Sequence, residues 1–239
     1  MGSRRRTRSR SGPGVLVLAV VLVGVGLLGA YLLGRLAVTA PQLAEGRIPP
    51  VAYEAYLAAS AAAPTVTAPC AVDWTVLAGI AQVESHHGRI DPDHDLAANG
   101  DVLPPIRGAA LDGTRGTEPV PDTDGGELDG DVQWDRAMGP LQFIPTTWRE
   151  LGRDGNGDGV ADPDNLYDAG LTAVAHLCAR TPGDYGDRAQ LRAALVGYNA
   201  SGRYAEEVLG WVERYRTEPL ADVIESPELT SPAEHPTSG

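Results

Sequence analysis

The chain has 239 residues, of which 43% are hydrophobic, and its formal net charge is −13. This length accommodates one or two domains. Five arginines lie within the first ten residues (Arg4, Arg5, Arg6, Arg8 and Arg10), and without their positive charges the remainder carries −18. So acidic a chain repels the phosphate backbone, which excludes nucleic acid as an expected partner.

The N-terminal segment predicts a membrane anchor. The run from Val15 to Gly34 contains no charged residue. At 1.5 Å per residue it spans about 30 Å, the thickness of a bilayer core, with the arginines on the inner side. We therefore expect a basic cytoplasmic N-terminus at 1–14 and a transmembrane helix at 15–38, with the remaining chain outside the cytoplasm. The alternative is a signal peptide cleaved after the small residues 38–40, which would release a secreted protein.

Residues 39–69 and 218–239 are unsuited to a hydrophobic core. The first stretch is rich in proline and alanine. It predicts a linker with one short helix at 53–63, and would reach roughly 100 Å if fully extended. The second stretch is rich in Pro, Ser, Thr and Glu, which predicts a disordered tail. One domain, at 70–217, lies between them.

Cys70 and Cys178 are the only cysteines. Because disulfides persist outside the cytoplasm, we expect a bond between them. Closing a loop of about 100 residues stabilises a fold by up to roughly 4–5 kcal/mol in the chain-entropy model. The alternative is a pair of buried free thiols.

The domain at 70–217 has the pattern of a mainly α fold. Asp73 is a typical N-cap, and apolar residues follow it at helical spacing up to His86. Further helices are predicted at 146–151, 166–179, 188–196 and 203–215. The Gly-, Asp- and Pro-rich stretch at 90–136 predicts an insertion of ordered loop and short strands, and loops of that length are usually functional.

Three short segments carry the strongest functional signal: Glu84-Ser85 at the end of the first predicted helix, Gly139 to Phe143, and Gly197 to Asn199. In this order they resemble the lytic transglycosylases that cleave bacterial peptidoglycan, of the membrane-bound lytic murein transglycosylase B type. The resemblance covers roughly residues 70–216. It implies a lysozyme-like fold, an SLT domain, whose cleft holds the sugar chain. With the predicted anchor, it also implies a single-pass protein of the bacterial cell membrane.

Glu84 is the residue to which the resemblance assigns the chemistry. Cleavage of a glycosidic bond needs a carboxylic acid that stays protonated near neutral pH, and burial against neighbours such as Ile80 and Val83 provides one. By its position alone, Glu84 also fits a solvated surface residue, which is the commoner arrangement on helices.

The resemblance implies a reaction without a second carboxylate. Glu84 would protonate the leaving oxygen between N-acetylmuramic acid and N-acetylglucosamine, the N-acetyl group would assist departure, and the 6-hydroxyl would close a 1,6-anhydro ring. From the sequence, Asp122, Asp124 or Asp131 could still serve as a second carboxylate, and the enzyme would then be a muramidase-type hydrolase that uses water. A third interpretation is an inactive peptidoglycan-binding module.

Several residues near these segments are candidates for binding glycan strands. The resemblance and the side-chain chemistry together give the substrate-binding set Ser85, Gln142, Phe143, Tyr198, Asn199 and Trp134. An amide both donates and accepts hydrogen bonds, which suits an N-acetyl sugar, and aromatic rings stack on sugar faces. The alternatives are a structural turn in which Gln142 bonds the backbone, a buried tyrosine at position 198, and core packing for Phe143 and Trp134.

The segment that begins at Asp154 has the spacing of a calcium loop. Asp154, Asn156 and Asp158 occupy positions 1, 3 and 5, glycine follows at position 6, and Val160 would offer its carbonyl at position 7. Position 12 is Asn165 instead of glutamate, so Asp168 is the expected carboxylate ligand. We expect a structural Ca²⁺ ion and no organic cofactor; the alternative is a surface turn rich in Asp and Gly.

Overall fold

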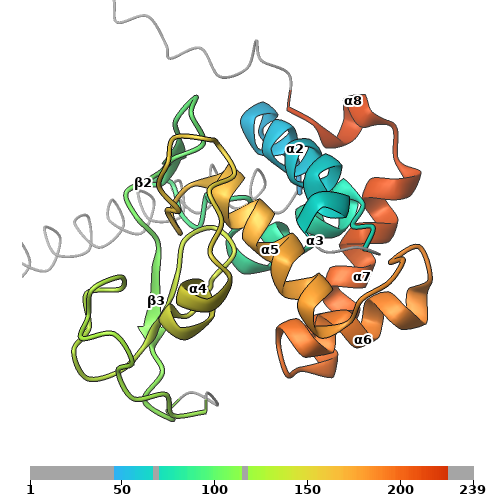
Figure 1. Cartoon of the computed structure of the whole chain (residues 1–239). Helices are drawn as coiled ribbons and strands as arrows, with labels where there is room; N and C mark the ends of the chain where they lie inside the picture. Colours follow the sequence, from blue (N-terminus) through green and yellow to red (C-terminus); the bar gives the residue numbers. More distant parts are fainter. Residues whose placement is uncertain (1–45, 67–69, 115–117, 226–239) are drawn as a thin grey trace, which may run out of the picture. The chain divides into compact units, whose positions relative to one another are not determined.

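A computed structural model of the chain describes residues 46–66, 70–114 and 118–225 (Figure 1). The predicted cytoplasmic N-terminus and membrane anchor, at 1–14 and 15–38, lie outside these residues. No helix within the described ranges is long and apolar enough to cross a bilayer.

The described part is mainly helical, which confirms the predicted fold class at that level. Its helices are α2 (Pro50–Val66), α3 (Trp74–Ser85), α4 (Pro145–Leu151), α5 (Leu166–Arg180), α6 (Arg188–Tyr198), α7 (Gly202–Thr217) and α8 (Leu220–Val223). Its strands are β1 (Asp95–Leu96), β2 (Val102–Leu103), β3 (Arg107–Ala110) and β4 (Arg136–Met138). The strands form two separate antiparallel pairs, β1–β2 and β3–β4, as expected for the insertion.

Helix α3 is buried along most of its length and packs closely on α7. Asp73 caps its N-terminus, accepting a hydrogen bond from the backbone N–H of Thr75 at 3.0 Å. The helix ends at His86, which adopts the left-handed conformation at φ 52°. Gly79 permits the close approach of α7, because a Cβ atom there would lie 2.8 Å from Cγ2 of Val212. These features fix where the last turn of α3 lies.

The short helix predicted at 53–63 is present as part of α2, but residues 50–66 belong to the folded domain and not to a linker. They form α2, which packs against α5 and buries five side chains: Ala52, Ala55, Tyr56, Ala59 and Ala63. Most of this face is alanine, so its hydrophobic pattern is weak, yet small side chains let two helices approach closely. A Cβ atom at Gly170 of α5 would lie only 3.4 Å from Cβ of Ala59.

The predicted disordered tail is also wrong for its first residues. Helix α8 follows α7, and Ile224 pairs with Ile48 in a parallel bridge. Glu225 accepts a hydrogen bond from Arg89 at 2.7 Å. The two ends of the folded part are thus joined to each other.

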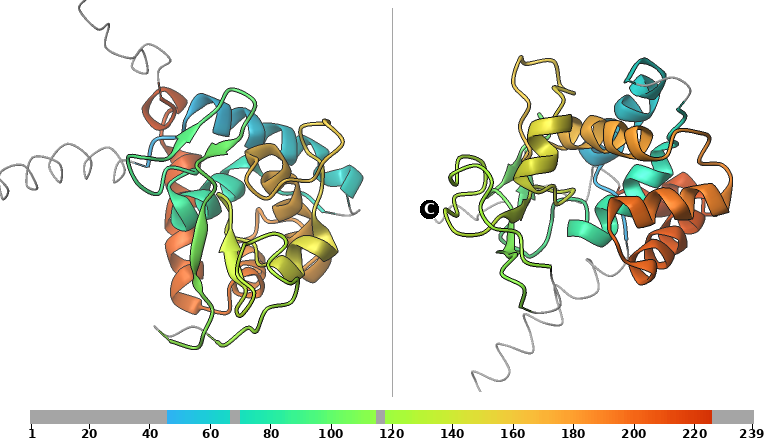
Figure 2. Two further views of the ribbon diagram at one scale, coloured as in Figure 1. Left: turned by 90° about the vertical axis from the view of Figure 1, so that its left-hand side faces the viewer. Right: turned by 60° about the horizontal axis from the view of Figure 1, so that its bottom comes forward.

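Helices and strands occupy different sides of the domain. In Figures 1 and 2 the strands, their loops and α4 lie to one side of α5, and α2, α3, α6 and α7 lie to the other. The predicted disulfide is confirmed: Cys70, before α3, is bonded to Cys178 of α5, with a Cα–Cα distance of 5.8 Å. It ties the start of α3 to the central helix.

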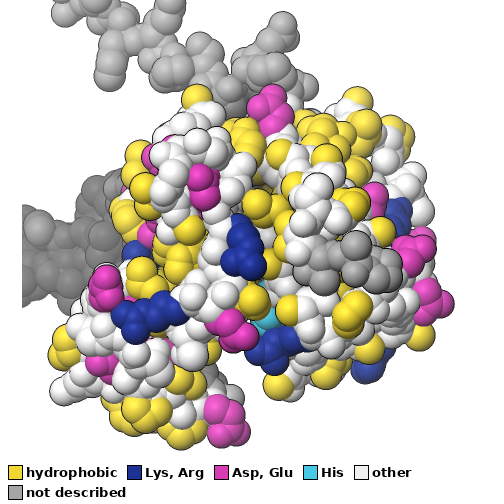
Figure 3. Space-filling view, viewed as in Figure 1, with side chains coloured by type: hydrophobic (Ala, Val, Ile, Leu, Met, Phe, Trp, Pro, Cys, Tyr) yellow, Lys and Arg dark blue, Asp and Glu magenta, His cyan; other side chains and the backbone are white. Residues whose placement is uncertain are grey.

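Hydrophobic side chains on the face in Figure 3 are interspersed with charged and polar atoms. The large hydrophobic residues that remain exposed come from separate elements: Leu57, Ile90, Leu103, Val132, Val160 and Leu220. Single exposed apolar residues of this kind are normal on folded proteins.

Candidate active site

Two hydrogen bonds join the three segments that carry the resemblance. The Ser85 hydroxyl donates to the carbonyl of Pro140 at 2.7 Å, and the Tyr198 hydroxyl donates to the carbonyl of Leu141 at 3.0 Å. The two bonded pairs are separated by 55 and 57 residues in sequence. The turn at 139–143 therefore lies between the end of α3 and the end of α6.

The turn itself is locked against a neighbouring loop. Gly139 has φ +68°, and a Cβ atom at that position would lie 1.8 Å from the carbonyl oxygen of Pro163, so no other residue fits there. Met138 and Phe143 exchange backbone hydrogen bonds of 2.8 and 3.1 Å across the turn. The result is a rigid backbone edge beside the last turn of α3.

Glu84 is the carboxyl group at this meeting point, and its side chain is half-buried. Burial raises the pKa of Glu84 to about 7 from its usual 4.5, and the Tyr204 hydroxyl lowers the pKa by a smaller amount. Burial, and to a smaller degree the charge of Glu84, raises the pKa of Tyr198. A carboxyl group in these surroundings is partly protonated at neutral pH, which a general acid requires.

Tyr204, in the first turn of α7, is a functional candidate that sequence reasoning missed. Its ring stacks parallel to that of Tyr198, with centroids 6.5 Å apart. Its buried hydroxyl interacts with the carboxyl group of Glu84 and lowers the pKa of that group. The sequence offered only a tyrosine three residues after the N-cap Ser201, a position equally suited to the core.

Ser85 does not face open solvent. It is 2% exposed. Besides donating to Pro140, its hydroxyl accepts a hydrogen bond from the backbone N–H of Gly88 at 2.7 Å. Both contacts are internal, so Ser85 holds the end of α3 to the turn instead of offering itself to a sugar. The predicted contact with substrate is not supported by this position.

Gln142 has the unusual φ of +53°. Its side-chain amide nitrogen donates to the carbonyl of Gly139 at 2.8 Å, within its own turn. This is the structural alternative set out from the sequence. The side chain is half-buried at the turn.

Phe143 is buried at 3% exposure, which matches the core packing given as the alternative to stacking on a sugar face. Its ring packs against Trp148, Tyr198 and His176 at centroid distances of 5.6, 5.7 and 6.1 Å. The ring packs in the interior beside Tyr198, because the interior of the domain offers it more apolar contact than the surface does.

The two remaining predicted contacts are not joined to the Glu84 region by the described interactions. Asn199 is exposed at the C-terminal end of α6. Trp134 is half-buried in the insertion, where it pairs with Pro121 and bonds Asp131 through its backbone N–H.

His176 of α5 is a second residue that sequence reasoning missed. It is 5% exposed, and its ring lies 4.9 Å from that of Tyr198. Neither ring nitrogen has a hydrogen-bond partner in the described part of the chain. Burial, together with the charge of Arg180, lowers the pKa of His176 to about 4, so the imidazole is neutral near pH 7.

The predicted calcium loop is ordered around Asp168, whose carboxylate is fully buried. This carboxylate accepts backbone hydrogen bonds from Gly155, Asn156 and Asp162 at 2.7, 3.1 and 2.8 Å. Burial, and to a lesser degree the charge of Asp154, raises the pKa of Asp168. The donor set of carboxylate, amide and carbonyl oxygens fits a hard cation. Its positive charge would relieve the repulsion between the carboxylates of Asp154 and Asp168. Asp154 and Asp158 likewise accept backbone hydrogen bonds, from Gly157, Gly159 and Val160.

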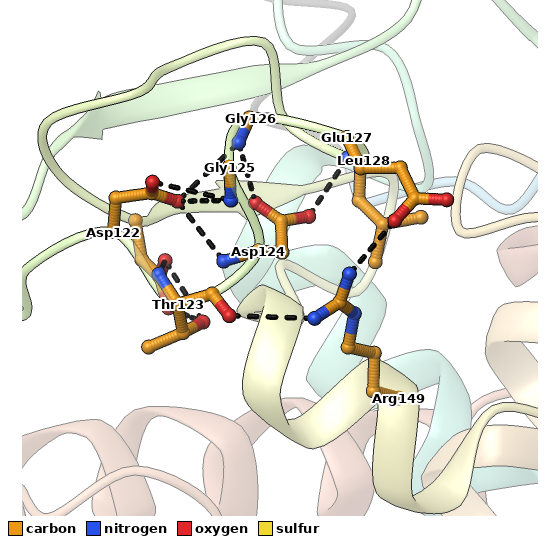
Figure 4. A network of polar contacts seen from close by, with 9 residues as sticks. Asp122, Thr123, Asp124, Gly125, Gly126, Glu127, Leu128 and Arg149 are labelled. Carbon is orange, nitrogen blue, oxygen red and sulfur yellow. Dashed lines mark hydrogen bonds and ion pairs between the residues drawn. The ribbon is translucent and has the colours of Figure 1, made fainter.

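A tighter cluster of carboxylates lies elsewhere among the described residues. Oxygen atoms of Asp122, Asp124 and Asp135 lie within 4.8 Å of one another. Figure 4 shows that Asp122 and Asp124 accept hydrogen bonds from backbone N–H groups of their own loop, while Arg149 bonds Thr123 and Glu127. These bonds organise the loop.

Comparison with known proteins adds no further information on function. No protein-family model matches this chain, and neither a curated protein nor a solved structure matches it.

Proposed function

We propose that the protein is a peptidoglycan lytic transglycosylase that cleaves the β-1,4 bond between N-acetylmuramic acid and N-acetylglucosamine. One observation carries the proposal: burial raises the pKa of the Glu84 carboxyl to about 7, and this carboxyl interacts with Tyr204 and with Tyr198, whose hydroxyl is bonded to the turn at 139–143. A protonated acid beside fixed hydroxyl groups is suited to protonating a leaving sugar oxygen.

In the proposed reaction Glu84 acts twice. As an acid it gives its proton to the glycosidic oxygen, and the bond from that oxygen to C1 of the muramic acid breaks. As a base it then takes the proton of the same sugar's 6-hydroxyl, whose oxygen bonds C1 and closes the 1,6-anhydro ring. The proton count balances and no water is consumed. An intramolecular hydroxyl has a large effective concentration over water, which favours this ending.

The hydrolase alternative needs a second carboxylate near the reacting bond. The three candidates from the sequence are each engaged within the insertion. Asp122 and Asp124 accept backbone hydrogen bonds there, and Asp131 forms an ion pair with Arg136 at 2.7 Å. Hydrogen bonds from backbone N–H groups lower the pKa of Asp122 and Asp131. These contacts favour a structural role for all three, and so favour the transglycosylase.

The proposed setting follows from the rest of the chain. A membrane anchor at 15–38 would hold the domain on the outer face of the cell membrane, within reach of peptidoglycan glycan strands. A Ca²⁺ ion in the loop at 154–168 would stabilise the start of α5 without contacting substrate, since this loop is built from surface donors and from Asp168.

The deciding experiment is the digestion of purified peptidoglycan sacculi, followed by mass spectrometry of the released fragments. We expect products that end in 1,6-anhydromuramic acid from the wild type and none from Glu84→Gln. Products with reducing ends, 18 Da heavier through the addition of water, would replace the proposal by a muramidase-type hydrolase.

The same preparation tests the binding-module alternative. If the wild type and Glu84→Gln both sediment with sacculi but neither releases fragments, the protein binds peptidoglycan without cleaving it. Glu84→Gln is nearly isosteric, so its sedimentation should match that of the wild type in every case.

A further inference from the structure

His176 is a buried polar side chain without an evident structural task. A neutral imidazole carries one N–H donor and one acceptor nitrogen. Both nitrogens of His176 are buried, and neither has a partner among the described residues. Buried polar groups in folded proteins nearly always have a hydrogen-bond partner, and one left without it costs stability. An apolar ring of similar shape would avoid this cost, so the unpaired imidazole calls for a role in another state of the protein.

The position of His176 indicates which state that is. Its ring contacts Phe143 of the turn and Tyr198 of α6, and so two of the three segments at the candidate site. Tyr198 in turn is close enough to Glu84 for the two groups to influence each other electrostatically. Tyr198 thus contacts His176 and is coupled electrostatically to the proposed acid.

The hydroxyl of Tyr198 is the polar group through which His176 could act. In the free protein this hydroxyl donates to the carbonyl of Leu141 at 3.0 Å. The ring nitrogens of His176 are closed off from solvent, so a sugar does not reach them while Tyr198 and Phe143 stay in place. Tyr198, whose ring centroid is 4.9 Å away, is in direct ring contact with the imidazole.

We propose that His176 is a positioning residue, whose imidazole takes up a hydrogen bond with the Tyr198 hydroxyl when a bound glycan draws this hydroxyl away from the Leu141 carbonyl. The neutral ring gives the hydroxyl a second defined position and holds it there during cleavage. The unpaired imidazole destabilises the free protein, and the new hydrogen bond removes this destabilisation when the glycan is bound. This inference rests on the proposed function, because it assigns the bound state to a glycan at Glu84.

Two substitutions separate the polarity of His176 from its bulk. His176→Phe keeps an aromatic ring and removes both nitrogens, while His176→Asn keeps a donor and an acceptor and loses bulk. We expect His176→Phe to raise the melting temperature by about 2–6 °C, because unpaired polar atoms leave the core. On sacculi we expect it to lower kcat about tenfold with little change in KM, and His176→Asn to retain more of kcat despite a lower melting temperature.

A double-mutant cycle tests whether His176 acts through Tyr198. In a Tyr198→Phe background, where the hydroxyl is absent, His176→Phe should cause no further loss of kcat. Independent, multiplying losses would overturn the inference, as would full activity of His176→Phe in the wild-type background. A melting temperature lowered by His176→Phe would also overturn it, since the nitrogens would then have partners in the free protein.

Failure of this inference and failure of the proposed function give different results. If the wild type releases anhydro products and the cycle is additive, only the role of His176 is lost. If the wild type releases nothing, the proposed function fails. The state of the His176 imidazole is then measured directly by NMR. We expect the ¹⁵N resonances of His176 in labelled protein to shift when tetra-N-acetylchitotetraose is added. Unchanged resonances at millimolar oligosaccharide would overturn the inference as well.

Discussion

The end of α3 and the loop at 118–135 both carry carboxyl groups, in opposite surroundings. Glu84 is half-buried, is approached by tyrosines, and has its pKa raised to about 7 by burial. Asp122 and Asp131 are supplied with backbone N–H donors, which lower their pKa values. The carboxyl group is thus a proton donor at Glu84 and a hydrogen-bond acceptor at Asp122 and Asp131. Burial removes water from the first and raises its pKa, whereas backbone hydrogen bonds stabilise the charge of the other two and lower theirs.

Substitution of Glu84 is the most direct test of its role as a proton donor. We expect Glu84→Gln to reduce the release of fragments from sacculi by about 10²–10⁴-fold, the range for loss of a general acid–base group. The matched control is Glu213→Gln, the same substitution at an exposed position of α7, which should leave the rate within about twofold of wild type. A similar loss in both variants would show that the effect is not specific to the candidate site.

The raised pKa of Glu84 also predicts a stability effect that does not depend on activity. The unfolded carboxyl loses its proton near pH 4.5 and the folded one near 7. Between these values the native state binds more protons, so this group lowers the stability of the fold as pH rises, with the full loss above about pH 7. Glu84→Gln lacks this loss.

Denaturant unfolding at two pH values measures this effect. Relative to wild type, Glu84→Gln should be unchanged near pH 4 and more stable by up to about 3 kcal/mol at pH 8, at 1.36 kcal/mol for each pKa unit. The control Glu213→Gln should show no such dependence. An equal difference at both pH values would mean that Glu84 is an ordinary solvated carboxylate.

Calcium binding distinguishes the loop at 154–168 from the loop that contains Asp122 and Asp124. At ten times Kd, calcium should stabilise the protein by about 1.4 kcal/mol, which corresponds to about 3–6 °C in melting temperature after stripping with a chelator. We expect Asp168→Asn to abolish this shift and Asp122→Asn to preserve it. The reverse pattern would move the cation to the cluster of Asp122, Asp124 and Asp135, and no shift in any protein would count against both loops.

The smallest expected effect concerns the hydroxyl that faces Glu84. Because Tyr204 lowers the pKa of this carboxyl, Tyr204→Phe should raise the pKa further and move the alkaline limb of the pH–activity profile upward. The change in activity at pH 7 should stay below about tenfold. A shift of the limb toward lower pH would show that the hydroxyl stabilises the protonated form instead.

Sequence reasoning located the main helices because their signals are local. The N-cap Asp73 and the apolar spacing after it predicted α3, and Asn165 caps α5 as a side-chain acceptor of the kind that starts a helix. A short helix was predicted at 53–63, but the packing of α2 into the domain was missed, because a face of alanines has little hydrophobic contrast, although it buries well against Gly170. The sequence left Phe143 open between stacking on a sugar and packing in the core, because an aromatic ring in a turn can face either solvent or core, and the choice depends on neighbours distant in sequence.

By itself, the sequence determined a mainly helical domain, the disulfide partners and the one glutamate in the last turn of α3. These follow from spacing, capping and the count of cysteines. Only the tertiary structure decided that Tyr204 and His176 belong beside the site, that Ser85 faces inward, and that the pKa of Glu84 is raised. The reason is physical: burial and hydrogen-bond satisfaction are properties of the surroundings of a side chain, and those surroundings are assembled from segments far apart along the chain.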